Sequence, residues 1–130
     1  MVHKHCTKEQ FTQAKIRLKE IEKQMCIYAP GFHSVGQDRP GSEDILAMSM
    51  VKRSKNETRD IGILFDDNPL QETFTFYAAK SMREGSDLYF KRADIVQNIS
   101  MKELENNLES HCKLALEHLD LWKLEDLSKM

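Results

Sequence analysis

One stretch of the sequence, residues 59–80, most limits how this chain can fold. It contains two runs of alternating apolar residues separated by the segment DDNP at residues 66–69, which is typical of a tight turn. Alternate side chains point to opposite faces of a β-strand, so each run gathers its apolar residues on one face. These residues are Ile61, Ile63 and Phe65 in the first run and Phe74, Phe76 and Ala78 in the second. The stretch predicts an antiparallel hairpin with one apolar face that the rest of the chain must cover.

Amphipathic helices are predicted before and after this hairpin. The first extends from Thr7 to about Tyr28 and has apolar residues at spacings of three and four. Those residues are Phe11, Ala14, Leu18, Ile21 and Met25. The second begins at a capping box formed by Ser100 and Glu103 and is expected to continue to about Leu127. Its apolar surface is wider than a single stripe, which predicts contacts with two surfaces or with a partner.

Two further strands are predicted beside the hairpin. Residues 44–54 alternate in the manner of a strand, and residues 88–96 follow a polar turn at residues 83–87. Sequential strands joined by short turns favour a meander. We therefore predict a single α+β domain over residues 1–130. It consists of an N-terminal helix, a four-stranded antiparallel meander and a long C-terminal helix, with both helices on one face of the sheet.

The composition predicts one globular domain rather than a disordered or membrane-spanning chain. The chain has 130 residues, 40% of them hydrophobic and 31% charged, with a net charge of −2. This length can bury a core without disulfides or metals. Three scattered cysteines, Cys6, Cys26 and Cys112, lack the CxxC spacing of redox or zinc motifs. We expect reduced thiols in a cytoplasmic protein, with Cys26 and Cys112 packed in the core, and no membrane association.

Patterns typical of catalysis, metal binding or cofactor binding are weak or missing in the sequence. No glycine-rich phosphate loop or nucleophile elbow is found. His3, His5 and Cys6 are interpreted as part of a frayed terminus rather than as a metal site. His111 and His118 are two helical turns apart, about 10 Å, which is too far for one ion. The prediction is a protein that is not an enzyme and has no catalytic residues, no metal and no cofactor.

Acidic residues are concentrated where the meander brings separate segments together. Alternate connections of a meander lie at the same end of the sheet, so the segment before the first strand shares an end with the turn of the hairpin. This end collects six acids against Arg39 alone, a net charge of −5. The six predicted partner-binding residues are Asp38, Glu43, Asp44, Asp66, Asp67 and Glu72. The opposite end, which includes Lys80, has a net charge of +2.

Three functional hypotheses follow from these features. The first is a non-catalytic inhibitor, such as an immunity protein or antitoxin, whose acidic surface blocks a basic, nuclease-like toxin. The second is a chaperone or adaptor that binds an apolar segment of a partner through the C-terminal helix, or a homodimer formed through that helix. The third is an enzyme or small-ligand domain with a pocket between helix and sheet. Nucleic-acid binding is disfavoured because the basic residues are interleaved with acids and lack stacking aromatics.

Overall fold

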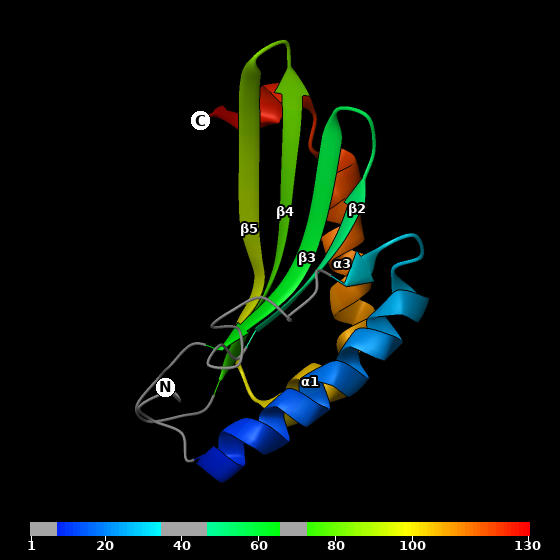
Figure 1. The fold of residues 1–130 in the computed structure, drawn as a ribbon, viewed down its shortest axis with the longest axis vertical. Coiled ribbons are helices and arrows are strands. Elements are labelled where there is room, and N and C mark those ends of the chain that lie inside the picture. Colours follow the sequence, from blue (N-terminus) through cyan, green and yellow to red (C-terminus); the bar gives the residue numbers. More distant parts are fainter. Residues whose placement is uncertain (1–7, 35–46, 66–72) are drawn as a thin grey trace.

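The structure, a computed structural model, describes residues 8–34, 47–65 and 73–130. It is an α+β fold in which a long twisted sheet is backed by helices (Figure 1). The elements in chain order are α1 (Lys8–Tyr28), β1 (His33–Ser34), β2 (Ala47–Arg53), β3 (Glu57–Phe65), β4 (Phe74–Glu84), β5 (Asp87–Ile99), α2 (Met101–Asn106), α3 (Leu108–Leu121), the 3-10 helix η2 (Leu124–Asp126) and β6 (Ser128–Lys129).

The sheet is an antiparallel meander with the order β1-β2-β3-β4-β5-β6. This confirms the predicted meander of four main strands, to which the two-residue strands β1 and β6 are added at the edges. The predicted hairpin is formed by β3 and β4, in which Ile61 lies opposite Ala78 and Ile63 lies opposite Phe76. Gly85, with a φ of +61°, supplies the left-handed backbone that the tight turn between β4 and β5 requires.

The core lies between one face of the sheet and the helices. On the sheet, Ile61, Ile63 and Phe76 are fully buried. On the helices, the buried side chains include Leu18, Ile21 and Met25 of α1 and Leu104, Cys112, Ala115 and Leu119 of α2 and α3. The predicted placement of both helices on the face of Ile61, Ile63, Phe74 and Phe76 is therefore confirmed, and α3 lies behind the sheet in Figure 1. The predicted core side chains of Phe11 and Phe65 lie outside the described part of the structure.

The predicted long C-terminal helix is wrong in its extent. The capping box at its start is present, because the Ser100 hydroxyl accepts a hydrogen bond from the backbone N–H of Glu103 at 3.2 Å. The helix is interrupted at Asn107, whose side-chain amide donates to the carbonyl oxygen of Glu103 at 3.3 Å. α3 then ends at Leu121, because the backbone becomes extended at Trp122 and leads through η2 into β6.

The side chain of Lys80, on β4, reaches the end of α3 and binds the last carbonyl groups there. The side chain of Lys80, which the sequence analysis counted among the charges at the opposite end of the sheet, is only 4% exposed. Its ammonium group donates hydrogen bonds to the carbonyl oxygens of Leu119 and Trp122, at 2.8 and 2.6 Å, and lies 3.1 Å from a carboxylate oxygen of Glu57. A cation at this position satisfies the free carbonyls and the negative pole of the helix end.

The two cysteines in the described ranges differ in their surroundings. Cys112 is fully buried in the core, as predicted, and burial raises the pKa of its thiol to about 12. Cys26 is exposed, so its predicted place in the core is wrong. It follows Met25 by one residue and is therefore rotated by about 100° from the buried stripe of α1. None of the helices within the described ranges is both long and apolar enough to cross a membrane.

Candidate functional site

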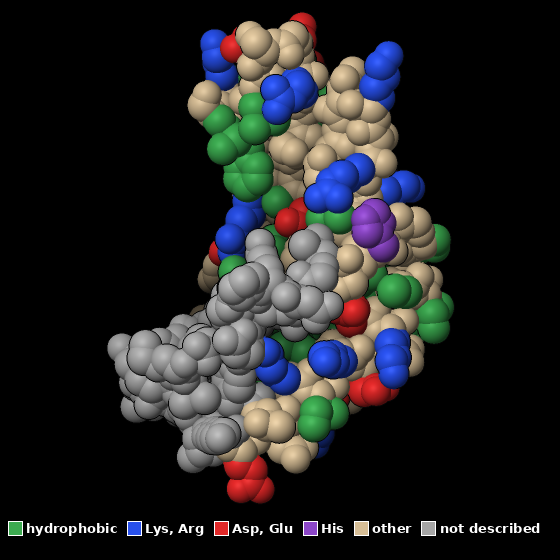
Figure 2. All heavy atoms as spheres, in the orientation of Figure 1, with side chains coloured by type: hydrophobic (Ala, Val, Ile, Leu, Met, Phe, Trp, Pro, Cys, Tyr) green, Lys and Arg blue, Asp and Glu red, His purple; other side chains and the backbone are tan. Residues whose placement is uncertain are grey.

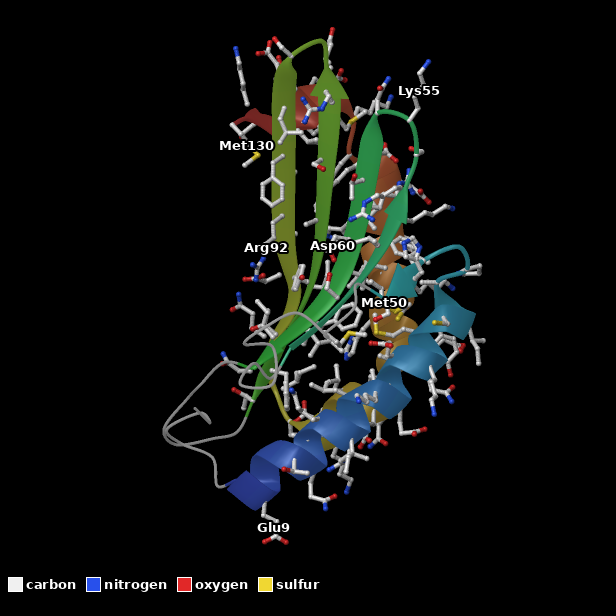
Figure 3. All side chains as sticks on the ribbon, viewed as in Figure 1. Glu9, Met50, Lys55, Asp60, Arg92 and Met130 are labelled. Carbon is white, nitrogen blue, oxygen red and sulfur yellow. The ribbon has the colours of Figure 1, made fainter. Side chains whose placement is uncertain are left out.

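The face of the sheet opposite the helices carries a polar cluster built around Gly62. On β4, the ring of Tyr77 lies across Gly62 of β3, because a Cβ at that glycine would be only 2.3 Å from the ring. The absence of a side chain at Gly62 thus allows Tyr77 to lie flat over the sheet. Asp60 and Arg92, labelled in Figure 3, lie on the same face on β3 and β5. We refer to Ser49, Asp60, Tyr77, Arg92 and Asp94 as the open-face cluster.

A side-chain hydrogen bond connects β2 and β3 within this cluster. The hydroxyl of Ser49 on β2 donates to a carboxylate oxygen of Asp60 at 2.8 Å. The Tyr77 side chain of β4 lies near Ser49 on the same face of the sheet.

An ion pair on β5 completes the open-face cluster. The guanidinium of Arg92 lies 4.4 Å from the centre of the Tyr77 ring and pairs with the carboxylate of Asp94 at 3.0 Å. The side-chain amide of Gln97 donates to the second carboxylate oxygen of Asp94 at 2.9 Å. The stacking fixes Arg92 over an aromatic ring, an arrangement that favours a planar guanidinium over an ammonium group.

The environment of the open-face cluster disfavours negative charge on two of its members. Partial burial raises the pKa of Asp60, although the hydrogen bond from Ser49 and the charge of Arg92 act against this. Burial also raises the pKa of Tyr77, and the nearby charge of Asp60 adds to that effect. A carboxylate held partly desolvated on an otherwise open sheet face is a feature that occurs frequently at binding sites.

The open-face cluster presents carboxylates that are already oriented by neighbouring side chains. Ser49 donates its proton to a carboxylate and not to a histidine, so it lacks the paired base of an activated serine. His33 of β1 lies on the same face, but it is opposite Val51, which in turn is opposite Asp60. Two strand spacings, about 10 Å, therefore separate His33 from Asp60. The carboxylates of Asp60 and Asp94 can instead accept hydrogen bonds from a cationic ligand or partner.

The six predicted partner-binding residues lie outside the described part of the chain. Asp38, Glu43 and Asp44 belong to residues 35–46, and Asp66, Asp67 and Glu72 belong to residues 66–72. The strands to which these two segments attach are described, however. Ala47 at the start of β2 is opposite Leu64, and Phe65 at the end of β3 is opposite Phe74. The attachment points of both segments therefore lie at one end of the sheet, as the predicted meander requires.

The open-face cluster is close to this same end of the sheet. Ser49 is two residues from the start of β2, Gly62 is three residues from the end of β3, and Tyr77 is three residues from the start of β4. We refer to this end, with the two attached segments, as the acid-bearing end. Lysine and arginine side chains are spread over the rest of the visible surface rather than gathered in one patch (Figure 2).

The histidines predicted not to bind a metal are divided between described and undescribed residues. His3, His5 and Cys6 lie outside the described ranges. The described residues contain no group of three histidine, cysteine or acidic side chains that could hold an ion. On α3, the ring of His111 packs against Phe76 with centroids 5.6 Å apart, and that of His118 packs against Trp122 at 5.8 Å. Both histidines therefore pack along the edge of the core.

Sequence reasoning missed the open-face cluster. Neither Asp60 nor Tyr77 is among the residues predicted from the sequence to bind a partner. The alternation of side chains along the strand could have indicated this cluster, because it puts Asp60 and Gly62 on one face of β3. Comparisons with models of protein families, with curated proteins and with solved structures found no match to the chain.

Proposed function

We propose that this protein is a non-catalytic inhibitor that binds a basic partner protein through its acid-bearing end. A nuclease-like toxin is the kind of partner that fits best, which would make the protein an immunity protein or antitoxin acting in the cytoplasm. The observation that carries the proposal is the strand register, which attaches the two acid-rich segments to the same end of the sheet. Six acids against one arginine in those segments supply the charge.

The open-face cluster supports the same proposal, since it extends the polar surface from that end onto the sheet. Asp60 and Asp94 are carboxylates held by Ser49, Arg92 and Gln97 in fixed positions. A cationic side chain of the partner would recover hydrogen bonding for Asp60, whose charged form is disfavoured in the free protein. Fixed acceptors of this kind lose little conformational entropy on binding.

The proposed mechanism of inhibition is occupation of a cationic site. Nuclease active sites carry positive charge because they hold phosphates, so an acidic protein surface can take the place of the nucleic acid. Charge of opposite sign also accelerates the encounter, and this acceleration declines with ionic strength. The inhibitor needs no catalytic group of its own, and its effect depends on affinity alone.

The experiment compares two double variants that each remove two acids. Asp66→Asn with Asp67→Asn changes the acid-bearing end, and Glu117→Gln with Glu125→Gln removes two exposed acids from the C-terminal region as a matched control. The partner is first isolated by co-purification at low salt, and its affinity is then measured for each variant at low and high salt. The proposal expects weaker low-salt binding for the first variant only. Equal affinity of both variants would contradict it.

A second candidate function is supported by exposed leucines on α3. Leu121 is 73% exposed and Leu114 is 40% exposed, and their spacing of seven residues places them on the same side of the helix. This favours the adaptor hypothesis, in which α3 binds an apolar segment of another protein. The charge change Leu121→Lys separates the two candidates. It should abolish partner binding by an adaptor and leave binding through the acid-bearing end unchanged.

A further inference from the structure

The outer edge of β5 is open over most of its length. β6 pairs with β5 only at Tyr89 and Phe90, and the backbone N–H of Met130 adds a hydrogen bond of 2.9 Å to the carbonyl oxygen of Leu88. From residue 91 to the end of β5, no strand within the described part of the chain pairs with this edge. An open edge presents backbone donors and acceptors that another strand can use.

The backbone groups that face this edge can be identified from β6. In an antiparallel ladder, a residue directs its N–H and C=O to the same side, and successive residues alternate sides. The carbonyl of Leu88 faces β6. Arg92 and Asp94 are an even number of residues further along β5, so their backbone groups point to the same side, which is the open edge. Ala93, which lies between them, is opposite Ala78 of β4 and directs its groups inward.

The charges on β5 are complementary to those of a second β5 in only one register. If two copies pair antiparallel about a two-fold axis at Ala93, Arg92 of each copy lies opposite Asp94 of the other. An axis at Arg92 or at Asp94 instead places identical charges opposite each other, which destabilises a strand pair. In the favoured register, each Arg92–Asp94 pair also exchanges two backbone hydrogen bonds, because both residues direct these groups outward.

We propose that the β5 edge is a self-association surface, through which two copies of this chain join their sheets about a two-fold axis at Ala93. The arrangement is isologous, so it closes as a dimer. The stretch of β5 that can pair with a second copy is limited by β6 at one end and by irregularities in β5 at the other. These are the register shifts opposite Phe76 and the positive φ of 58° at Asn98. The short contact predicts a weak dimer that forms reversibly with increasing concentration.

This surface differs from the C-terminal helix, through which the sequence predicted a possible homodimer. The dimer does not depend on the proposed function, because it rests on the open edge of β5 and not on the acidic segments, although Arg92 and Asp94 also belong to the open-face cluster. Both Arg92 and Asp94 already form an ion pair within one chain, with a distance of 3.0 Å. In the dimer, two such pairs would become a four-charge cluster around the two-fold axis.

The test uses charge reversal and mixing, followed by sedimentation from micromolar to millimolar concentration. The wild type should dimerise, whereas Arg92→Asp alone and Asp94→Arg alone should each weaken the dimer by about tenfold or more, since like charges then face each other. Mixing the two single variants should restore dimerisation as a heterodimer, because each interface pair then joins opposite charges. An effect confined to one chain cannot produce this restoration.

The charge-reversal test has a control variant and a check that each variant folds. Lys113→Asp reverses one exposed charge on α3 and should leave the dimer unchanged. Melting curves identify a variant that fails to fold, and Arg92→Glu with Asp94→Lys then provides a second matched pair. The proposal is overturned if the wild type stays monomeric at millimolar concentration. It is also overturned if folded single variants dimerise like the wild type, or if their mixture does not recover dimerisation.

Discussion

At the scale of single residues, the candidate site depends on a position without a side chain. Gly62 allows the Tyr77 ring to lie across the sheet, where the guanidinium of Arg92 lies over the ring. The cluster is therefore organised by contacts between neighbouring strands. Asp60 keeps a carboxylate in surroundings that disfavour its charge.

Gly62→Ala is predicted to displace Tyr77 from the cluster. The new methyl group would stand 2.3 Å from the ring, so the ring must move and lose its contact with Arg92. We expect a loss of about 1–3 kcal/mol in the free energy of unfolding, typical of inserting a group into a packed site. Chemical denaturation of both single variants and of Gly62→Ala with Tyr77→Ala tests this. Additive effects of the two substitutions would contradict the proposed contact.

Asp60→Asn is predicted to stabilise the protein at neutral pH. Because the pKa of Asp60 is raised on folding, the folded protein binds more protons than the unfolded chain between the ordinary pKa of an aspartate and the raised value. The wild type therefore loses stability as the pH rises through this window, whereas the asparagine variant does not. Melting temperatures should be higher for the variant at pH 7 and should converge with the wild type below about pH 4. A variant that is less stable at pH 7 would contradict this account.

At the scale of elements, local patterns predicted most of the strands and helices, including the start of the C-terminal helix, but neither its interruption nor its end. The alternation of residues 59–80 and the stripe of Leu18, Ile21 and Met25 are visible in sequence because each involves neighbours within one element. The end of α3 depends instead on Lys80, which is 39 residues from Leu119 in the sequence. The partners Ser49 and Asp60 are likewise on different strands, so their hydrogen bond could not be predicted before the register was known.

Lys80→Met is predicted to destabilise the junction between β4 and the end of α3. The substitution keeps an extended apolar side chain but leaves the carbonyl oxygens of Leu119 and Trp122 without their donor. We expect a loss of about 2–3 kcal/mol, since buried polar groups would be left unpaired. The matched control is Lys55→Met in an exposed turn, which should change stability by less than about 0.5 kcal/mol. Equal stability of the two variants in thermal unfolding would contradict the role of Lys80.

At the scale of the whole molecule, we assign the acid-bearing end and the β5 edge to different interactions, and the open-face cluster lies next to both. The meander brings the connections of residues 35–46 and 66–72 to one end of the sheet, and this relation could be predicted because it follows from strand order alone. The β5 edge could not be predicted, since its openness depends on how far β6 extends along it. The placement of the six acids themselves remains a prediction from sequence.

The central claim is that two separate acidic segments act together as one surface for a basic partner. The most direct measurement is the association rate constant with the co-purified partner as a function of ionic strength. It compares the wild type, Asp66→Asn with Asp67→Asn, Asp38→Asn with Asp44→Asn, and the variant that combines all four substitutions. We predict that each pair slows association at low salt, that the combined variant is slowest, and that all rates converge at high salt because the steering is screened. Rates that are equal for all four proteins at low salt would contradict the claim.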